Sequence, residues 1–149
     1  MVNREISLRG RALAMLARRE HTRAEMKRKL SPHCEDSVQV EQLLDMLVAR
    51  GWLSETRFAE SRANALARKF GCLKIEHDLR SRGVSAEVVD QTVERALAQE
   101  LENCRAAWQR KFGVLPQSAA ERGRQMRFLA GRGFSADAVR QILKTGDAD

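Results

Sequence analysis

Apolar residues recur every three or four positions along most of the chain, which is the pattern of amphipathic helices. The segment 55–70 is typical, because Ala59, Ala63 and Leu66 form one stripe while charged residues such as Arg57 fall outside it. The composition agrees, since there are two prolines and no tyrosine. We therefore predict an all-α protein with nine helices, at residues 4–20, 23–30, 38–50, 55–70, 74–82, 86–99, 100–112, 119–132 and 136–144.

Start and stop signals of helices divide the apolar pattern. Thr22 with Glu25 and Ser118 with Glu121 have the spacing of capping boxes, in which both residues satisfy free backbone amides. Other predicted start residues are Asp36, Ser54, Ser85 and Ser135. Glycine directly after arginine marks three predicted helix ends, because glycine adopts the left-handed cap conformation and a cation complements the helix dipole. These glycines are Gly51, Gly83 and Gly133.

The predicted break between the sixth and seventh helices lacks such a signal. Residues 86–112 contain neither proline nor glycine. The sequence therefore leaves two alternatives for this segment, two helices that meet near Gln99 or one long bent helix.

The chain repeats itself. Residues 79–93 (LRSRGVSAEVVDQTV) match residues 129–143 (LAGRGFSADAVRQIL) in register, and 67–71 (ARKFG) match 109–113 (QRKFG). The second pair is eight positions closer, which places an eight-residue insertion around 114–121 of the later copy. A fainter first copy begins near Arg11. We expect three tandem three-helix repeats, at 1–53, 54–99 and 100–149, that stack into an elongated, curved array.

The net charge of +7 comes mainly from arginine, with 21 arginines against six lysines. Guanidinium groups bind carboxylates and phosphates through paired hydrogen bonds, so a phosphate backbone or an acidic protein surface fits this composition. The aromatic residues fall mostly on apolar stripes, so base-stacking platforms are not expected. We predict that Trp52 packs back toward Leu47, and that Trp108 shares a buried stripe with Cys104 and Phe112.

Several classes of protein are disfavoured. No apolar stretch approaches the roughly 18 to 20 residues of a membrane span, and no export signal precedes the first helix, so we expect a cytoplasmic protein that does not bind membranes. The three cysteines, Cys34, Cys72 and Cys104, are expected to be free buried or half-buried thiols. We find no catalytic constellation and no set of metal ligands, and we expect neither enzyme activity, nor a metal, nor a cofactor.

Four segments carry a resemblance to a known family. They are 12–30 (ALAMLARREHTRAEMKRKL), 51–59 (GWLSETRFA), 70–83 with Phe70-Gly71 and Arg82-Gly83, and 127–134 with Arg127-Phe128-Leu129 and Arg132-Gly133-Phe134. Together they resemble the RecX family of recombination regulators over residues 9–144. One departure is Cys72-Leu73, where the family commonly has proline after the glycine, and this leaves the start of the fifth helix open.

The resemblance implies a bacterial regulator that lies in the groove of the RecA filament on single-stranded DNA, and capping of the filament ends stays open as a second mode. We also expect a monomer. Such a protein would inhibit the ATPase, strand exchange and filament extension of RecA. Charge and repeat geometry suggest a binding set for this partner: Arg57, Arg62, Arg68, Lys69, Arg80, Arg82, Arg110, Lys111, Arg127 and Arg132. The alternative is a basic helical protein that binds single- or double-stranded DNA without RecA.

Overall fold

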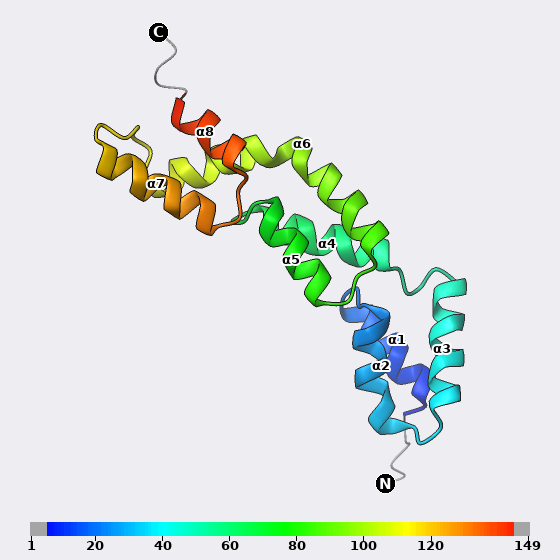
Figure 1. Ribbon diagram of the computed structural model, residues 1–149. Coiled ribbons are helices and arrows are strands. Elements are labelled where there is room, and N and C mark those ends of the chain that lie inside the picture. Colours follow the sequence, from blue (N-terminus) through cyan, green and yellow to red (C-terminus); the bar gives the residue numbers. More distant parts are fainter. Residues whose placement is uncertain (1–5, 145–149) are drawn as a thin grey trace.

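The computed structural model describes residues 6–144, and within that range the chain is helical and has no strand. It contains α1 (Leu8–Arg18), α2 (Arg23–Leu30), the 3₁₀ turn η1 (Ser31–His33), α3 (Ser37–Ala49), α4 (Glu55–Ala67), α5 (Cys72–Ser81), α6 (Ala86–Lys111), α7 (Ala119–Gly131) and α8 (Ala136–Lys144). The all-α prediction is confirmed. Figure 1 shows an elongated, bent body with α1–α3 at one end and α7 and α8 at the other.

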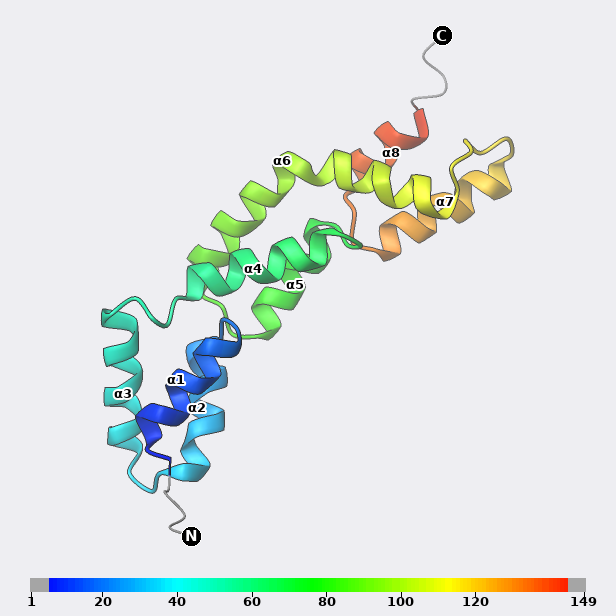
Figure 2. The ribbon, with the colours of Figure 1, turned by 180° about the vertical axis from the view of Figure 1, so that it is seen from behind.

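The prediction of nine helices is wrong for the described residues, which form eight α-helices. The sixth and seventh predicted helices are one continuous 26-residue helix, α6, because nothing between Ala86 and Lys111 interrupts the backbone hydrogen bonds. The predicted boundary at 99/100 therefore falls inside a helix, and α6 extends over both later repeats (Figure 2).

Other helix bounds shift by a few residues. The first helix begins at Leu8, where Ser7 caps it, and the part predicted for residues 4 and 5 lies outside the described range. The fourth helix ends at Ala67, three residues earlier than predicted. The fifth begins at Cys72, two residues earlier, although Gly71 offers no side-chain cap. The Glu100 carboxylate of α6 takes the role of the cap, because it accepts a hydrogen bond from the N–H of Cys72.

Most predicted start residues do cap their helices. The hydroxyls of Thr22, Ser54 and Ser118 each accept a hydrogen bond from the backbone N–H three residues later. Neither capping box is reciprocal, however. The Glu25 carboxylate pairs with Arg19, and the Glu121 carboxylate accepts from the N–H of Gln117 rather than Ser118.

The remaining signals have mixed outcomes. Asp36 accepts from the N–H of Val38, and the Ser135 hydroxyl accepts from the N–H of Ala138. Ser85 is the exception, since its side chain makes no cap bond and its N–H donates to Glu55. The predicted glycine ends are confirmed, with φ of +72°, +80° and +87° at Gly51, Gly83 and Gly133.

Three separate hydrophobic clusters form the core, one for each successive group of helices. The first lies among α1, α2 and α3 and centres on Met26, Leu30 and Leu44. The second lies among α4, α5 and the start of α6, and the third among the end of α6, α7 and α8. Each unit thus buries its own apolar stripes, as expected of a helical repeat protein.

The second and third units are tied together at Glu100 in the middle of α6. This carboxylate is only 5% exposed, and its Oε1 accepts hydrogen bonds from the N–H of Cys72 at 3.2 Å and of Ser135 at 3.1 Å. These N–H groups begin α5 and precede α8, where the positive ends of helix dipoles favour an anion. One side chain therefore fixes two helix starts against a third helix.

Two glycines allow the backbones to meet beside Glu100. The N–H of Gly71 donates to the carbonyl of Arg132 at 2.9 Å, and the N–H of Leu73 donates to the carbonyl of Gly133 at 3.1 Å. A Cβ at Gly71 would lie 2.5 Å from the backbone of residues 133 and 134. Only glycine fits this crossing, so the turn after α7 is held against the start of α5.

The first unit is joined to the second less closely. Arg57 on α4 pairs with Glu20 after α1 at 2.9 Å, and the turn at Gly83 lies against Ala24 at the start of α2. A cleft of about 800 Å³ lies between α2, α3 and the start of α4. No backbone hydrogen bond among the described residues crosses this junction in the way that two cross at Gly133.

The free cysteines are placed as predicted. Cys72 and Cys104 are buried, and Cys34 is half-buried. Burial, with the Glu100 carboxylate nearby, raises the pKa of the Cys72 thiol to about 12 and that of Cys104 to about 11. Both side chains are therefore neutral packing groups under ordinary conditions.

Candidate partner-binding site

A basic groove of about 400 Å³ lies where the end of α4, the end of α6 and α7 meet. We call it the basic groove and define it by its lining residues, which are Arg68, Lys69, Ala107, Arg110, Lys111, Phe128 and Arg132. Five of these seven residues are cationic and none is acidic. All five cations belong to the binding set predicted from the sequence.

The cations gather because three helices end at this point. Arg68 is the C-terminal cap residue of α4, Arg110 and Lys111 lie in the last turn of α6, and Arg132 is the cap residue of α7. Cations are favourable at helix C-termini, where the dipole is negative and carbonyls lack partners. One such carbonyl is used directly, since the Arg110 guanidinium donates to the backbone oxygen of Arg68 at 2.5 Å.

Aromatic rings hold the cations without neutralising them. The Lys111 ammonium lies 5.5 Å from the centroid of the Phe128 ring, and the Arg132 guanidinium lies 5.1 Å from it. Arg132 also lies 5.4 Å from the Phe70 ring, and Phe112 meets Phe128 edge-on at 5.4 Å. Such cation–π contacts orient the charges and leave their hydrogen-bond donors available.

The five cations of the basic groove have no acidic partner among residues 6–144. Their charges are therefore uncompensated in this part of the chain. An anionic group that entered the groove would meet several donors at once and would displace no internal carboxylate.

Three other residues of the predicted set, Arg62, Arg80 and Arg82, are used within the fold instead. Arg62 binds both oxygens of Asp78, at 2.9 and 3.0 Å, and Arg82 binds the same carboxylate at 3.1 Å. The hydrogen bonds from Arg62, joined by the charge of Arg82, hold the pKa of Asp78 below its ordinary value. Arg80 pairs with Glu76 at 3.0 Å.

The remaining two lie apart from the groove lining. Arg57 pairs with Glu20 and donates to the carbonyl of Gly51 at 2.7 Å, at the opposite end of α4. Arg127 is exposed on α7, next to Phe128, and makes no ion pair among the described residues. The structure thus brings together five residues of the predicted set and distributes five elsewhere.

Two residues of the groove lining, Ala107 and Phe128, are not in the predicted binding set. Phe128 is one of the aromatic residues predicted on apolar stripes, yet it is only half-buried and forms part of the groove wall with Ala107, which was not predicted. A second cleft of about 500 Å³ lies between α4 and α6 and is lined by small residues, by amides such as Asn64 and by the Glu60–Arg95 ion pair. The one sequence signal for the groove was the Arg-Lys pair that the two later repeats share, Arg68-Lys69 and Arg110-Lys111.

The prediction that Trp52 packs in the core is wrong. Its backbone N–H does donate to the carbonyl of Leu47, at 2.9 Å, as expected of this helix end. The side chain is nevertheless 40% exposed, because the next residue, Leu53, fills the buried position. Trp108 is half-buried against the third cluster and donates to Gln125, in agreement with the prediction for that residue.

Residues 6–144 contain no group of three or more His, Cys, Asp and Glu side chains that could hold a metal ion. Within the same range, no helix is both long and apolar enough to cross a membrane.

Comparison with known families gives two matches, in adjacent parts of the chain. Residues 54–93 match the second three-helix domain of RecX, and residues 98–143 match its third three-helix domain. The regulatory protein RecX of Leptothrix cholodnii is 46% identical over 143 residues, which cover 96% of this chain and 91% of the relative. The regulatory protein RecX of Chromobacterium violaceum is 42% identical over 145 residues, covering 96% and 93%.

Solved structures share the fold. The crystal structure of RecX from Lactobacillus salivarius superposes with a TM-score of 0.77 at 16% identity, over 95% of this chain and 96% of that one. A second crystal structure of a regulatory protein RecX gives 0.74 at 18% identity, over 91% of this chain and 70% of the other. The helical repeat fold and the near full-length sequence matches agree, and the chain belongs to the RecX family of regulatory proteins.

Proposed function

We propose that this protein binds the RecA nucleoprotein filament in the cytoplasm and inhibits its ATPase, its strand exchange and its extension. The basic groove would be a principal contact. Membership of a family of regulatory proteins supports the regulatory role, and the five uncompensated cations of the groove are the observation that carries the choice of surface.

The chemistry of the groove fits an anionic surface of a nucleoprotein polymer. Its arginines can each give paired hydrogen bonds to a carboxylate or a phosphate, and the filament presents both kinds of anion. The Phe128 ring holds the Lys111 ammonium and the Arg132 guanidinium at the groove wall through cation–π contacts. A contact of this kind loses less side-chain entropy than one made by free surface lysines.

The bent, elongated body supports contact with more than one subunit of a polymer (Figure 1). Several modest contacts along one body raise the apparent affinity by their effective concentration, without one tight site. Binding of this kind would regulate a filament without any catalytic group. The matched relatives are themselves named regulatory proteins.

The test is ATP turnover by the cognate RecA on single-stranded DNA, measured against increasing amounts of this protein. Reversing Arg68→Glu and Lys69→Glu together removes two contacts of roughly 1.5–3 kcal/mol each and adds repulsion, so half-inhibition should require at least about tenfold more protein. Circular dichroism should show an unchanged helical content, because both side chains are exposed.

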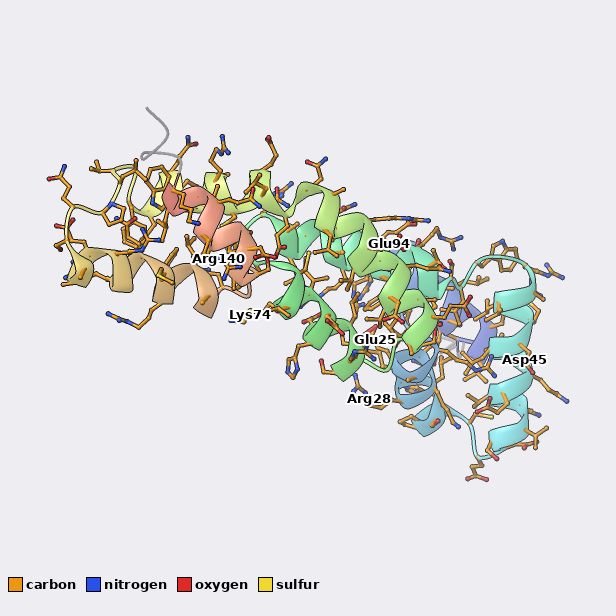
Figure 3. The ribbon with its side chains drawn as sticks, turned by 45° about the horizontal axis from the view of Figure 1, so that its top comes forward. Glu25, Arg28, Asp45, Lys74, Glu94 and Arg140 are labelled. Carbon is orange, nitrogen blue, oxygen red and sulfur yellow. The ribbon has the colours of Figure 1, made fainter. Side chains whose placement is uncertain are left out.

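A matched control lies on the first repeat. Arg28 and Lys29 form an adjacent, exposed pair on α2 with no ion pair among the described residues, and Arg28→Glu with Lys29→Glu makes the same change of charge. Figure 3 shows Arg28 on α2, at the other end of the body from α7, whose residues Phe128 and Arg132 line the groove. Equal loss of inhibition in both double variants would mean that net charge alone matters and would refute the groove as a contact.

A further inference from the structure

Trp52 is an exposed aromatic side chain held on a rigid turn. Gly51, with φ +72°, ends α3, and the Trp52 N–H closes the turn on the Leu47 carbonyl. The following residue, Leu53, is 3% exposed and anchors the turn in the first cluster. The indole is therefore positioned by its backbone on both sides, although the ring itself is not required to fill the core.

Two guanidinium groups lie over this indole. The Arg50 Cζ is 5.0 Å from the ring centroid, and the Arg9 Cζ, from α1, is 5.9 Å from it. Neither arginine pairs with a carboxylate among residues 6–144. The patch formed by Arg9, Arg50 and Trp52 thus combines an indole that is 40% exposed with two uncompensated cations.

A nucleotide carries both groups that this patch would bind. A base stacks on an aromatic ring, and the adjoining phosphate accepts paired hydrogen bonds from a guanidinium. An acidic peptide segment would occupy the arginines but leave the indole in water. In a duplex the base faces are already covered by neighbouring bases, so the aromatic face favours an unpaired strand.

We propose that Arg9, Arg50 and Trp52 form a contact for single-stranded nucleic acid, with one base stacked on the indole and its phosphate on the guanidiniums. This contact goes beyond the proposed function because it requires no recombinase. It is also separate from the basic groove. The patch precedes α4 and the groove follows it, and 13 residues of helix, about 20 Å at 1.5 Å per residue, lie between them.

The chain has only two tryptophans, so each can be made the sole fluorescent reporter. Trp108→Phe leaves Trp52 alone, and an oligothymidylate of about 15 nucleotides should quench its emission. Trp52→Ala leaves Trp108, which is half-buried and should not respond to the strand.

Affinity is measured separately by anisotropy of the labelled strand. Loss of one stacked base corresponds to about 5- to 140-fold weaker binding for Trp52→Ala, whereas Trp52→Phe, which keeps a ring, should retain most of the affinity. An abasic strand of the same length has phosphates without bases, and Trp52→Ala should bind it as the parent does. Leu97→Ala, which shortens another exposed apolar side chain, is the matched control and should bind both strands normally.

The arginines have their own signature. Removing one phosphate contact with Arg50→Ala should lower the slope of log K against log salt by about 0.7 on single strands. Equal effects of Trp52→Ala on thymidylate and abasic strands, or no effect on either, would overturn the proposal. So would intact strand binding combined with weaker inhibition of the recombinase, which would make the patch a protein contact. The variants Arg68→Glu and Lys69→Glu test the proposed function independently.

Discussion

Replacing Glu100 by alanine should destabilise the fold more than any single change in the basic groove. The substitution leaves the N–H groups of Cys72 and Ser135 without their acceptor at a buried site. A hydrogen bond to a charged group contributes about 1.5–3 kcal/mol, and two bonds to one oxygen are not fully additive. We therefore expect Glu100→Ala to lower the free energy of unfolding by about 3–5 kcal/mol, a large part of the usual total of about 5–15 kcal/mol.

Glu100→Gln separates the hydrogen bonds from the charge. Both N–H groups bind the same oxygen, Oε1, so the amide oxygen of glutamine can accept both and only the charge is lost. We expect a loss of about 1–2 kcal/mol for this variant. Urea unfolding followed by circular dichroism measures both values. Equal losses for the two variants, or a loss below about 1 kcal/mol for Glu100→Ala, would show that the carboxylate does not fix the two helix starts.

Three further predictions concern the junctions and the ion pairs. Gly133→Ala should lower the free energy of unfolding by about 2 kcal/mol or more, because its Cβ would lie 2.7 Å from the backbone nitrogen of Lys74 in α5. Gly51→Ala, at a similar φ but with nothing within 4 Å of the new Cβ, should lower it by about 1 kcal/mol. Urea unfolding midpoints compare the two variants. His21 is buried, and burial lowers its pKa, so the parent should lose stability as pH falls below 6.5 while His21→Gln shows no such slope in thermal melts. Arg62→Ala should cost about 1 kcal/mol at pH 7. Because Arg62 lowers the pKa of Asp78 in the fold, this difference should vanish as pH falls well below 3.8.

Local signals predicted helix type and most helix ends. The Arg-Gly ends at Gly51, Gly83 and Gly133 all have positive φ, since their conformation depends on residues within one turn. The continuity of α6 could not be predicted in this way, because residues 86–112 contain no local start or stop signal. One long helix was therefore one of two open alternatives. Local signals also do not reveal the role of Glu100, because its contacts with Cys72 and Ser135 are 28 and 35 positions away.

Predicting the site required knowing which charges have partners, and spacing does not show this. The repeat identified Arg68 with Arg110 as equivalents, and the two do lie together at one opening. Arg62 is also an arginine of a predicted helix, like Arg68 and Arg110, yet it is paired with Asp78 of α5. The outcome for Trp52 shows the same limit, because the choice between Trp52 and Leu53 for the buried position depends on the shape of the first cluster.

The basic groove is a consequence of how the repeats stack. Each Arg-Gly end stops its helix for local reasons, and stopping a helix places a cation beside unpaired carbonyls. The ends at Gly83 and Gly133 then lie against the preceding unit, at Ala24 and at Lys74, whereas a Cβ at Gly51 would have no neighbour within 4 Å. Among residues 6–144, the end at Gly133 is the only one of the three that backbone hydrogen bonds and Glu100 also hold against the preceding unit. There Arg132 is brought to the cations of α4 and α6, so residues that lie at the ends of separate helices in the sequence line one cationic groove in the fold.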